Sequence, residues 1–410
     1  MKKILLCAGG LVLSFAFVSA AYGGAIDNKT NWSAEYIRTL NRNAATDYAD
    51  IAAYNPAGTV KLQEGYTVNG SVQYLSKEYE NVINGTSYKS DEPSYIPGLF
   101  AVFNKKQFSI FGAISNVGGG GKVDYNQGNL TTLLAQLLIL PGNPAGANLT
   151  AESYYLGYTL GGAYALNDVF SFSVGIRYVD ASREVEGSAN TDAVPFPAAI
   201  IYEQDGNGWG GIFGVNISPN DSINIAMRYE TKTDLEFDTA VKKDTATYLP
   251  AGGLLPYLGI VNGTSSARDL PAIFAFGLSY WLNPKIRLET NYTHYFNADA
   301  DWAGAENLAE DGYDIGIALE YVFNEKLKAS IGYMHTELGL NPEDMLPENP
   351  ELDANTIGAG IAYAITEQFH TNISVGNSFY EDDAFALPPL NVEYKKNIFF
   401  MALGLEYRFM

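Results

Sequence analysis

Lys396-Asn397-Ile398-Phe399-Phe400-Met401-Ala402-Leu403-Gly404-Leu405-Glu406-Tyr407-Arg408-Phe409, followed by Met410, is the stretch of sequence that decides the fold. Every second residue is large and apolar: Phe399, Met401, Leu403, Leu405, Tyr407 and Phe409. The residues between them are mostly small or charged: Phe400, Ala402, Gly404, Glu406 and Arg408. This period of two predicts a strand with lipid on one face and a polar lumen on the other.

The chain begins with a predicted signal peptide, residues 1–23. Lys2 and Lys3 precede an apolar stretch from Ile4 to Val18, and small residues follow it. This arrangement is typical of a secretion signal and is too short to be favoured as a membrane anchor. The single cysteine, Cys7, lies inside this segment, so we expect a mature chain without thiols or disulfides, as suits an oxidising compartment.

The composition points to a membrane barrel. There are 29 Tyr, 21 Phe and 41 Gly, with 17% charged residues, and past the signal no segment has twenty consecutive apolar residues that would form a spanning helix. Without Lys2 and Lys3, the 25 basic residues fall to 23 against 46 acids, a net charge of about -23. Such acidity disfavours nucleic acid as a partner.

Fourteen alternating segments bounded by turn residues follow, and they predict an all-β membrane protein, a 14-stranded antiparallel transmembrane barrel over residues 66–410. The segments are 66–80, 94–103, 108–116, 151–166, 169–184, 204–218, 222–238, 269–282, 285–299, 311–323, 326–338, 354–366, 368–380 and 394–409. Short turns alternate with long connections, as in barrels of the bacterial outer membrane, so both termini are expected on the periplasmic side. A secreted β-sandwich or surface-layer protein is the alternative, but it would carry more charge on the non-core faces.

Two segments interrupt the strand pattern. Residues 24–65 read as helical, with Ser33 as an N-cap, and we expect them to form a hatch that plugs the lumen of the wide barrel. Residues 130–140 read as an apolar helix within a long extracellular loop.

The end of the hatch reads Tyr54-Asn55-Pro56-Ala57-Gly58, just before the first strand. Asn55 can bond its own backbone in a turn, Pro56 fixes φ, Ala57 keeps the segment thin, and Gly58 permits a positive φ. With the hatch and the fourteen strands, this motif resembles the FadL family of long-chain fatty-acid transporters. The resemblance implies passive uptake of hydrophobic compounds through an extracellular apolar groove, a lumen site and a hatch-gated lateral exit near a kink in the third strand. Ending on Met410, not on the aromatic residue, departs from the family and weakens the signal for the barrel-assembly machinery.

Candidate ligand-binding residues fall into two groups. An exposed apolar run in the 130–140 helix and a second apolar loop predict a docking surface, unless the two loops pack on each other to cap the barrel. The apolar residues are Leu130, Leu133, Leu134, Leu137, Leu138, Leu254 and Leu255. Strand parity points Arg177 and Arg228 into the lumen, along with Glu230, Arg287, Glu289, Glu320 and Lys328. Arg177 and Arg228 either bind a ligand carboxylate or belong to a network that braces the hatch.

Gly112, within the third strand, is the candidate for the kink at a lateral opening. We expect no catalytic residue, metal site or cofactor, since the three histidines do not converge. Long-chain fatty acids are the first ligand hypothesis, aromatic or aliphatic hydrocarbons the second, and a structural or adhesive barrel the third. Outer-membrane lipid and the hydrophobic ligand are the expected partners.

Overall fold

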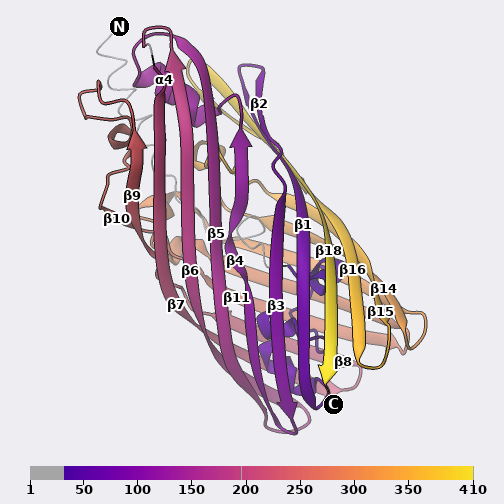
Figure 1. Cartoon of the computed structure of the whole chain (residues 1–410). Helices are drawn as coiled ribbons and strands as arrows, with labels where there is room; N and C mark the ends of the chain where they lie inside the picture. The colour runs from indigo at the N-terminus through magenta and orange to yellow at the C-terminus, as the bar shows by residue number, and fades with distance from the viewer. Residues whose placement is uncertain (1–31, 195, 410) are drawn as a thin grey trace.

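The computed structural model describes residues 32–194 and 196–409; the predicted signal peptide, residues 1–23, lies outside them. Fourteen strands form the barrel wall (Figure 1). They are β1 (Gly65–Ile83), β3 (Ser94–Lys105), β4 (Phe108–Tyr125), β5 (Pro144–Ala165), β6 (Phe170–Thr191), β7 (Ala198–Asn220), β8 (Ile223–Glu230), β11 (Ala272–Asn283), β12 (Ile286–Phe296), β13 (Gly312–Val322), β14 (Leu327–Glu337), β15 (Ala354–Ala364), β16 (Phe369–Tyr380) and β18 (Leu390–Phe409).

All neighbouring strands are antiparallel, and the barrel closes where β1 pairs with β18, from Tyr66 opposite Phe409 to Ile83 opposite Val392. Four short strands extend the wall at the long-loop end: β2 (Thr86–Ser90), β9 (Glu236–Asp244), β10 (Ser265–Ala267) and β17 (Asp383–Leu387). The fourteen predicted strands are therefore confirmed. β4 to β7 are longer than predicted, whereas the predicted strand 222–238 is wrong at its far end: β8 stops at Glu230, and β9 begins separately at Glu236.

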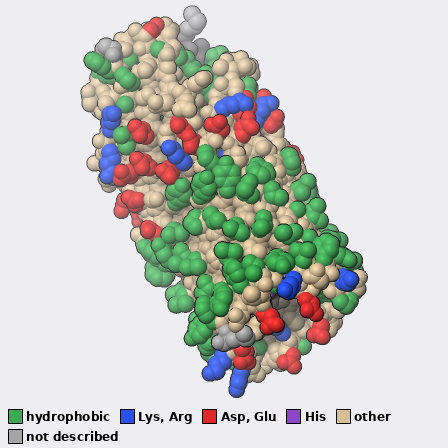
Figure 2. Space-filling view, turned by 45° about the vertical axis from the view of Figure 1, so that its right-hand side comes forward, with side chains coloured by type: hydrophobic (Ala, Val, Ile, Leu, Met, Phe, Trp, Pro, Cys, Tyr) green, Lys and Arg blue, Asp and Glu red, His purple; other side chains and the backbone are tan. Residues whose placement is uncertain are grey.

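The alternation of side chains sets the two faces of the wall. Phe170, Phe172, Val174 and Ile176 of β6 are exposed, whereas Arg177 is buried, as parity predicts. A belt of apolar side chains crosses the visible face, with acidic and basic side chains above and below it (Figure 2). This is the pattern expected where the outer surface meets lipid and its two rims meet water.

The helices lie inside the barrel or at its long-loop end. They are α2 (Ala34–Thr39), α3 (Ile51–Tyr54), η1 (Pro56–Lys61), α4 (Leu130–Leu138), η2 (Leu255–Leu258), η3 (Asn297–Asp299), η4 (Ala305–Leu308) and η5 (Pro342–Asp344). None of these helices is both long and apolar enough to cross a bilayer.

The described part of the hatch fills the lumen, and almost all of its residues are buried. Its first helix, α2, begins after Ser33, whose hydroxyl accepts from the amide of Tyr36 at 2.9 Å, and it packs against β13 to β16 and β18. A Cβ added at Gly332 or Gly358 would collide with the backbone oxygen of Thr39 or Ile37. The hatch backbone therefore rests directly on the inner face of β14 and β15.

Candidate functional site

The Asn55–Gly58 motif fixes the end of the hatch to the wall. The Asn55 side chain accepts from the Gly58 amide at 3.2 Å and donates to Asn216 of β7 at 2.8 Å. Ser171 of β6 donates to the Ala57 carbonyl at 2.7 Å. The predicted self-bonding of Asn55 is confirmed, but Gly58 does not have a positive φ. Glycine is needed there because a Cβ would collide with the Asn55 amide and approach the Ala45 oxygen at 3.1 Å.

A set of ion pairs connects the hatch to β12, β13 and β14. Arg38–Glu320 and Lys328–Asp47 (2.9 Å) join hatch to wall, Arg42–Asp47 (2.6 Å) and Arg42–Asp50 (2.5 Å) lie within the hatch, and Arg287–Glu320 (3.0 Å) lies within the wall. We call this set the hatch network. Each charge has an opposite partner, and the side chains of Arg38 and Glu320 are at most 1% exposed. Removing one partner would leave a buried charge unpaired.

Glu35 of the hatch forms no ion pair with these cations within residues 32–194 and 196–409, although Arg42 is near enough to act on its charge. Its Oε1 accepts from Asn69 of β1 at 2.7 Å and from Asn372 of β16 at 2.9 Å. Burial raises the pKa of Glu35 to about 8, and the nearby Asp50 carboxylate adds to the shift. The docked hatch therefore holds a proton here that a solvated glutamate would lose.

Both predicted lumen arginines already have protein partners. Arg177 Nη1 lies 2.5 Å from one oxygen of Glu230, and Arg228 Nε lies 2.8 Å from the other. Arg228 also donates to the carbonyls of Ala53 and Tyr54 in the hatch, each at 2.6 Å. Of the two roles that the sequence left open for these arginines, binding a ligand carboxylate or bracing the hatch, these contacts correspond to bracing.

The wall is interrupted between β3 and β4. The two strands pair from Lys105–Phe108 as far as Gly98–Ser115, and β4 has no ladder partner on β3 among the described residues beyond that point. Its pairing with β5 shifts register twice between Asn116 and Gly121. We call this interruption the wall gap.

Gly112 lies below the wall gap, in regular register with Ala101 and Leu160. The predicted kink at Gly112 is therefore corrected to Asn116–Gly121, where Gly119 and Gly121 have φ of +79° and +71°. These left-handed conformations are accessible to glycine and costly for other residues.

Two donors bridge the wall gap. Lys77 of β1 points into the lumen, is 3% exposed, and donates from Nζ to the carbonyls of Gly120 (2.8 Å) and Lys122 (2.6 Å) on β4. The Asp124 amide donates to Ser90 Oγ of β2 at 2.8 Å. Lys77 is not among the residues predicted from the sequence, although the alternation of Gln73, Leu75 and Tyr79 places it on the lumen face.

The predicted docking residues occupy two environments. Leu137 and Leu138 of α4 are 46% and 39% exposed. Leu130 is buried in an apolar cluster that includes Met345 and Leu352. Leu133 and Leu134 are half-buried and pack against this cluster. Leu254 and Leu255 are also buried, in a cluster with Ala135 and Leu140 next to α4. The two apolar loops thus pack on each other, and Leu137 and Leu138 are the most exposed apolar residues of α4, with Leu133 and Leu134 half-buried.

A loop at the long-loop end, residues 342–352, folds inward over the lumen. The Pro347 carbonyl accepts from Asn81 of β1 at 2.9 Å and from the Tyr125 hydroxyl of β4 at 3.3 Å. Lys396 of β18 donates to Asn349 and to the Pro350 carbonyl at 2.8 and 2.9 Å. Nothing in the sequence pattern marked this loop as part of the lumen.

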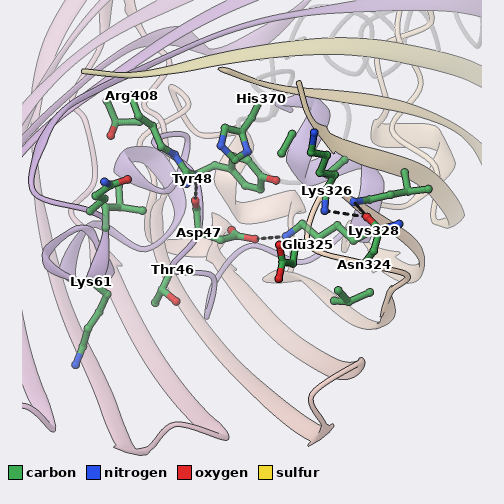
Figure 3. A pocket seen from close by; sticks show the side chains of 17 residues that line it. Thr46, Asp47, Tyr48, Lys61, Asn324, Glu325, Lys326, Lys328, His370 and Arg408 are labelled. Carbon is green, nitrogen blue, oxygen red and sulfur yellow. Dashed lines mark hydrogen bonds and ion pairs between the residues drawn. The ribbon is translucent and has the colours of Figure 1, made fainter. Parts of the chain in front are cut away.

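A polar cavity of about 400 Å³ opens at the short-turn end. Figure 3 shows Asp47 and Tyr48 of the hatch in this cavity, near Lys328, His370 and Arg408 of the wall. Its lining mixes charged side chains with apolar ones, among them Leu62, Val322 and Leu327. Among residues 32–194 and 196–409, no three His, Cys, Asp or Glu side chains are grouped to hold a metal ion.

Comparisons with known proteins agree with this architecture. A family model described as "Outer membrane protein transport protein (OMPP1/FadL/TodX)" matches residues 39–409. No curated protein matches the chain.

Several solved structures are similar in fold. A Pseudomonas aeruginosa FadL homologue has a TM-score of 0.74 at 13% identity, covering 94% of this chain and 100% of its own. The P. putida toluene transporter TodX has a TM-score of 0.67 at 13% identity, with 89% and 96% covered. The Ralstonia pickettii toluene transporter TbuX has a TM-score of 0.63 at 14% identity, with 95% and 97% covered. Because the family model spans hatch and barrel alike, the chain belongs to the FadL/TodX family of outer-membrane transport proteins.

Proposed function

We propose that this protein takes up long-chain fatty acids passively across the bacterial outer membrane. One observation carries the proposal: the lumen is filled by the hatch while the wall is interrupted between β3 and β4. A blocked axis and an interrupted wall suit a ligand that leaves sideways into lipid. Water-soluble solutes have no use for such a route, because lipid does not dissolve them.

The proposed path begins at α4. Leu137 and Leu138 offer the exposed apolar surface where a hydrophobic ligand docks. Leu130, Leu133, Leu134, Leu254 and Leu255 lie behind it in the loop clusters, so we assign them to the path only when the loops separate. The ligand then passes the 342–352 loop into the lumen and leaves through the wall gap after the hatch shifts.

Buried cations near the wall gap favour a ligand with an anionic head. Lys77 and Lys396 both lie inside the lumen at this level and are at most 5% exposed. An apolar chain with a carboxylate matches cations set among apolar side chains better than a neutral hydrocarbon does. Arg177 and Arg228 remain candidates for the same role, in which a ligand carboxylate would replace Glu230.

Aromatic or aliphatic hydrocarbons are the second candidate ligands. The fold similarity to toluene transporters supports them, as does the pairing of both lumen arginines with Glu230, which leaves these two groups occupied. We further propose that the short-turn end, with the C-terminus, faces the periplasm, and that the barrel-assembly machinery inserts the chain.

The test is uptake of labelled oleate and of labelled toluene by cells that lack their own transporters, with and without this protein. Oleate-selective uptake is the expected result. Toluene-selective uptake would move the assignment to hydrocarbons. Stimulation of neither, with the barrel shown to be inserted, would contradict both and leave a structural or adhesive role.

A further inference from the structure

The wall is interrupted a second time, at β7. This strand pairs with β8 as far as Ile212, and with β9 from Asp205 toward the long-loop end. Between the two ladders, Gly206–Gly210 form no backbone hydrogen bond to residues 231–235 within the part of the chain that the structure describes. We call residues 231–235, together with residues 268–271 that run beside them, the wall step.

The wall step lies on the lumen side of β7. Even-numbered residues of β7 face the lumen here, since Trp209 and Phe213 are exposed on the outer face. A Cβ added at Gly208 would collide with the carbonyl oxygen of Asp234. The wall step therefore covers the inner face of β7, where a regular neighbouring strand would lie beside it.

Asp269 holds the wall step in this position. Its carboxylate accepts from Lys232 Nζ at 2.6 Å and from the amides of Leu235 and Asp301, each at 3.0 Å. Lys232 also pairs with Asp234 at 2.9 Å. Asp269 is 3% exposed, but the side chain of Lys232 is 36% exposed. Ion pairs that water reaches are weak, so this attachment costs less free energy to break than the buried pairs of the hatch network.

Leu270 reaches from the wall step to the wall gap. It belongs to a buried apolar cluster, against which Val117 of β4 packs. Leu270 Cδ2 would lie 3.3 Å from a Cβ added at Gly118, in the bulged segment of β4. Because residue 270 and β4 are not neighbours in the wall, this contact crosses the lumen. We call the cluster the lumen seal, and its members are Tyr155, Val179, Ala181, Leu235, Phe237 and Leu270.

A cavity of about 30 Å³ lies between the lumen seal and the hatch. Its charged lining consists of Arg177, Arg228 and Glu230, which pair with one another, and we call it the arginine pocket. The hatch, Val117 of the wall gap and Leu270 of the wall step close it. This volume holds roughly two water molecules. A long apolar chain therefore enters only if one of the closing parts moves.

We propose that the wall step is a second gate, distinct from the hatch, which an apolar chain opens by displacing Leu270 from the lumen seal. Contacts between apolar side chains are non-directional, so a methylene chain replaces those of Leu270 without leaving a buried hydrogen-bonding group unpaired. Moving the hatch instead breaks the hydrogen bonds of Arg228 to the carbonyls of Ala53 and Tyr54. The lumen seal thereby admits an apolar chain while excluding water and ions.

This inference rests on the proposed function, because it takes the wall gap as the exit, and it adds a determinant of specificity. The length of the apolar chain, and not the charge of the head group, opens the gate. Oleate and methyl oleate should therefore both open it. Butyrate, which carries the same carboxylate on a short chain, should not.

The first experiment follows the wall step in lipid nanodiscs. Spin labels at Trp209→Cys and Asp234→Cys report its position relative to β7, because these side chains are 63% and 84% exposed. The control pair, Phe213→Cys and Tyr229→Cys, occupies directly paired and exposed positions of β7 and β8. Oleate and methyl oleate should each change the first distance and leave the second unchanged, and butyrate should change neither.

Thiol labelling then tests Leu270. Thr159→Cys places a cysteine in the lining of the arginine pocket, in a Cys7→Ser background that has no other cysteine. A water-soluble methanethiosulfonate reagent should label it about tenfold or more faster when Leu270→Ala is added, because the lumen seal loses its contact with Gly118. Leu255→Ala removes the same atoms from the separate loop cluster beside α4 and should leave the rate unchanged.

The same assay tests Asp269 as the positioning residue of the gate. Asp269→Asn keeps the shape of the side chain but removes its ion pair with Lys232, so Thr159→Cys should again be labelled faster. Lys232→Arg keeps the pair and should be labelled as slowly as wild type. A purely structural role of Asp269 would lower the thermal stability of the barrel without changing the labelling rate.

The outcomes separate the gate from the transport proposal. Equal labelling rates in Leu270→Ala and Leu255→Ala, or an oleate response that methyl oleate lacks, would overturn the gate even if cells take up oleate. If Leu270→Ala does not insert, the comparison of the three ligands in the spin-labelled protein still decides. A wall step that moves with both long chains, in a protein that stimulates no oleate uptake by cells, would uphold the gate and overturn the fatty-acid function.

Discussion

On the side of β13 and β14 the lumen wall meets the hatch through ion pairs between buried side chains, whereas on the side of β3 and β4 the wall is bridged by Lys77 and Ser90. The first region satisfies each charge with an opposite charge, as Arg38 and Glu320 do. The second uses hydrogen bonds to backbone groups, around glycines with positive φ. The ion-paired side is arranged to keep its geometry. The side at β3 and β4 is arranged to change its backbone geometry at a small cost in free energy.

Closing the weaker side covalently should have the largest effect. A Cβ added at Gly121 would lie 3.1 Å from Ser94 Cβ, so Ser94→Cys with Gly121→Cys should cross-link the gap on oxidation once the backbone shifts by about half an ångström. The cysteine at position 121 also carries the strain of a φ of +71°. Uptake should fall to the level of cells without the protein and recover on reduction. Uptake is measured with labelled ligand before and after adding dithiothreitol.

The matched control is Ala101→Cys with Gly112→Cys, which face each other in the regular part of the same ladder. Oxidation there should change nothing. Fast transport through the oxidised Ser94–Gly121 protein would show that the ligand leaves elsewhere.

Breaking the stronger side should loosen the hatch without opening the gap. Glu320→Gln leaves Arg38, Arg287 and Lys328 short of an anion, which should weaken hatch docking by about 3–5 kcal/mol. Faster proteolysis of the hatch in purified barrels would report this. Glu325→Gln, in the neighbouring exposed turn, is the control. Unchanged protection in Glu320→Gln would mean that the network is not what holds the hatch.

The pH should act on the hatch through Glu35. Its pKa in the docked hatch is about 8, against 4.5 for a solvated glutamate, so the docked state binds the extra proton between these values. Docking should therefore be strongest at low pH and weaken as pH rises from 4.5 to 8, with little further change above 8. We expect up to about a hundredfold loss of hydrogen-exchange protection in the hatch between pH 6 and 9, and a shallower profile for Glu35→Gln. A wild-type profile as flat as that of the variant would refute the assignment.

The smallest expected effect is at the docking surface. Replacing Leu137 and Leu138 by serine removes exposed apolar area without opening a core, so initial uptake at low ligand concentration should slow about threefold. The thermal stability of the barrel should not change. Substituting buried Leu130 instead should destabilise the loop cluster, which separates docking from folding. Uptake that is unaffected by the double substitution would remove α4 from the path.

Sequence alone predicted the wall well because a lipid-facing strand must alternate. The alternation of side chains within each strand shows which face meets lipid. Turns such as Asn283-Pro284 mark where one strand ends and the next begins. The N-cap at Ser33 was also predictable, because capping depends only on residues close to it in the sequence. Such short-range rules were sufficient wherever a single residue determines a feature.

The parts that failed depend on contacts between distant segments. The run Gly118–Gly121 has no side chains, so parity could not show that the ladder shifts there and not at Gly112. Gly58 was assigned to a positive φ, whereas its reason is the space taken by Asn55 and Ala45. The burial of Leu254 and Leu255 follows from a loop-to-loop contact that no local period encodes.

Many of the bonds that close this barrel end on main-chain oxygens. Arg228 holds the hatch through the carbonyls of Ala53 and Tyr54, and Lys77 holds β4 through those of Gly120 and Lys122. Since every amino acid supplies the same carbonyl, mutations in the held segments leave these bonds intact provided the backbone path survives. Residues of the hatch and of the wall gap can thus be substituted one by one during evolution while the architecture is kept. This is one physical route to a shared fold at 13% identity.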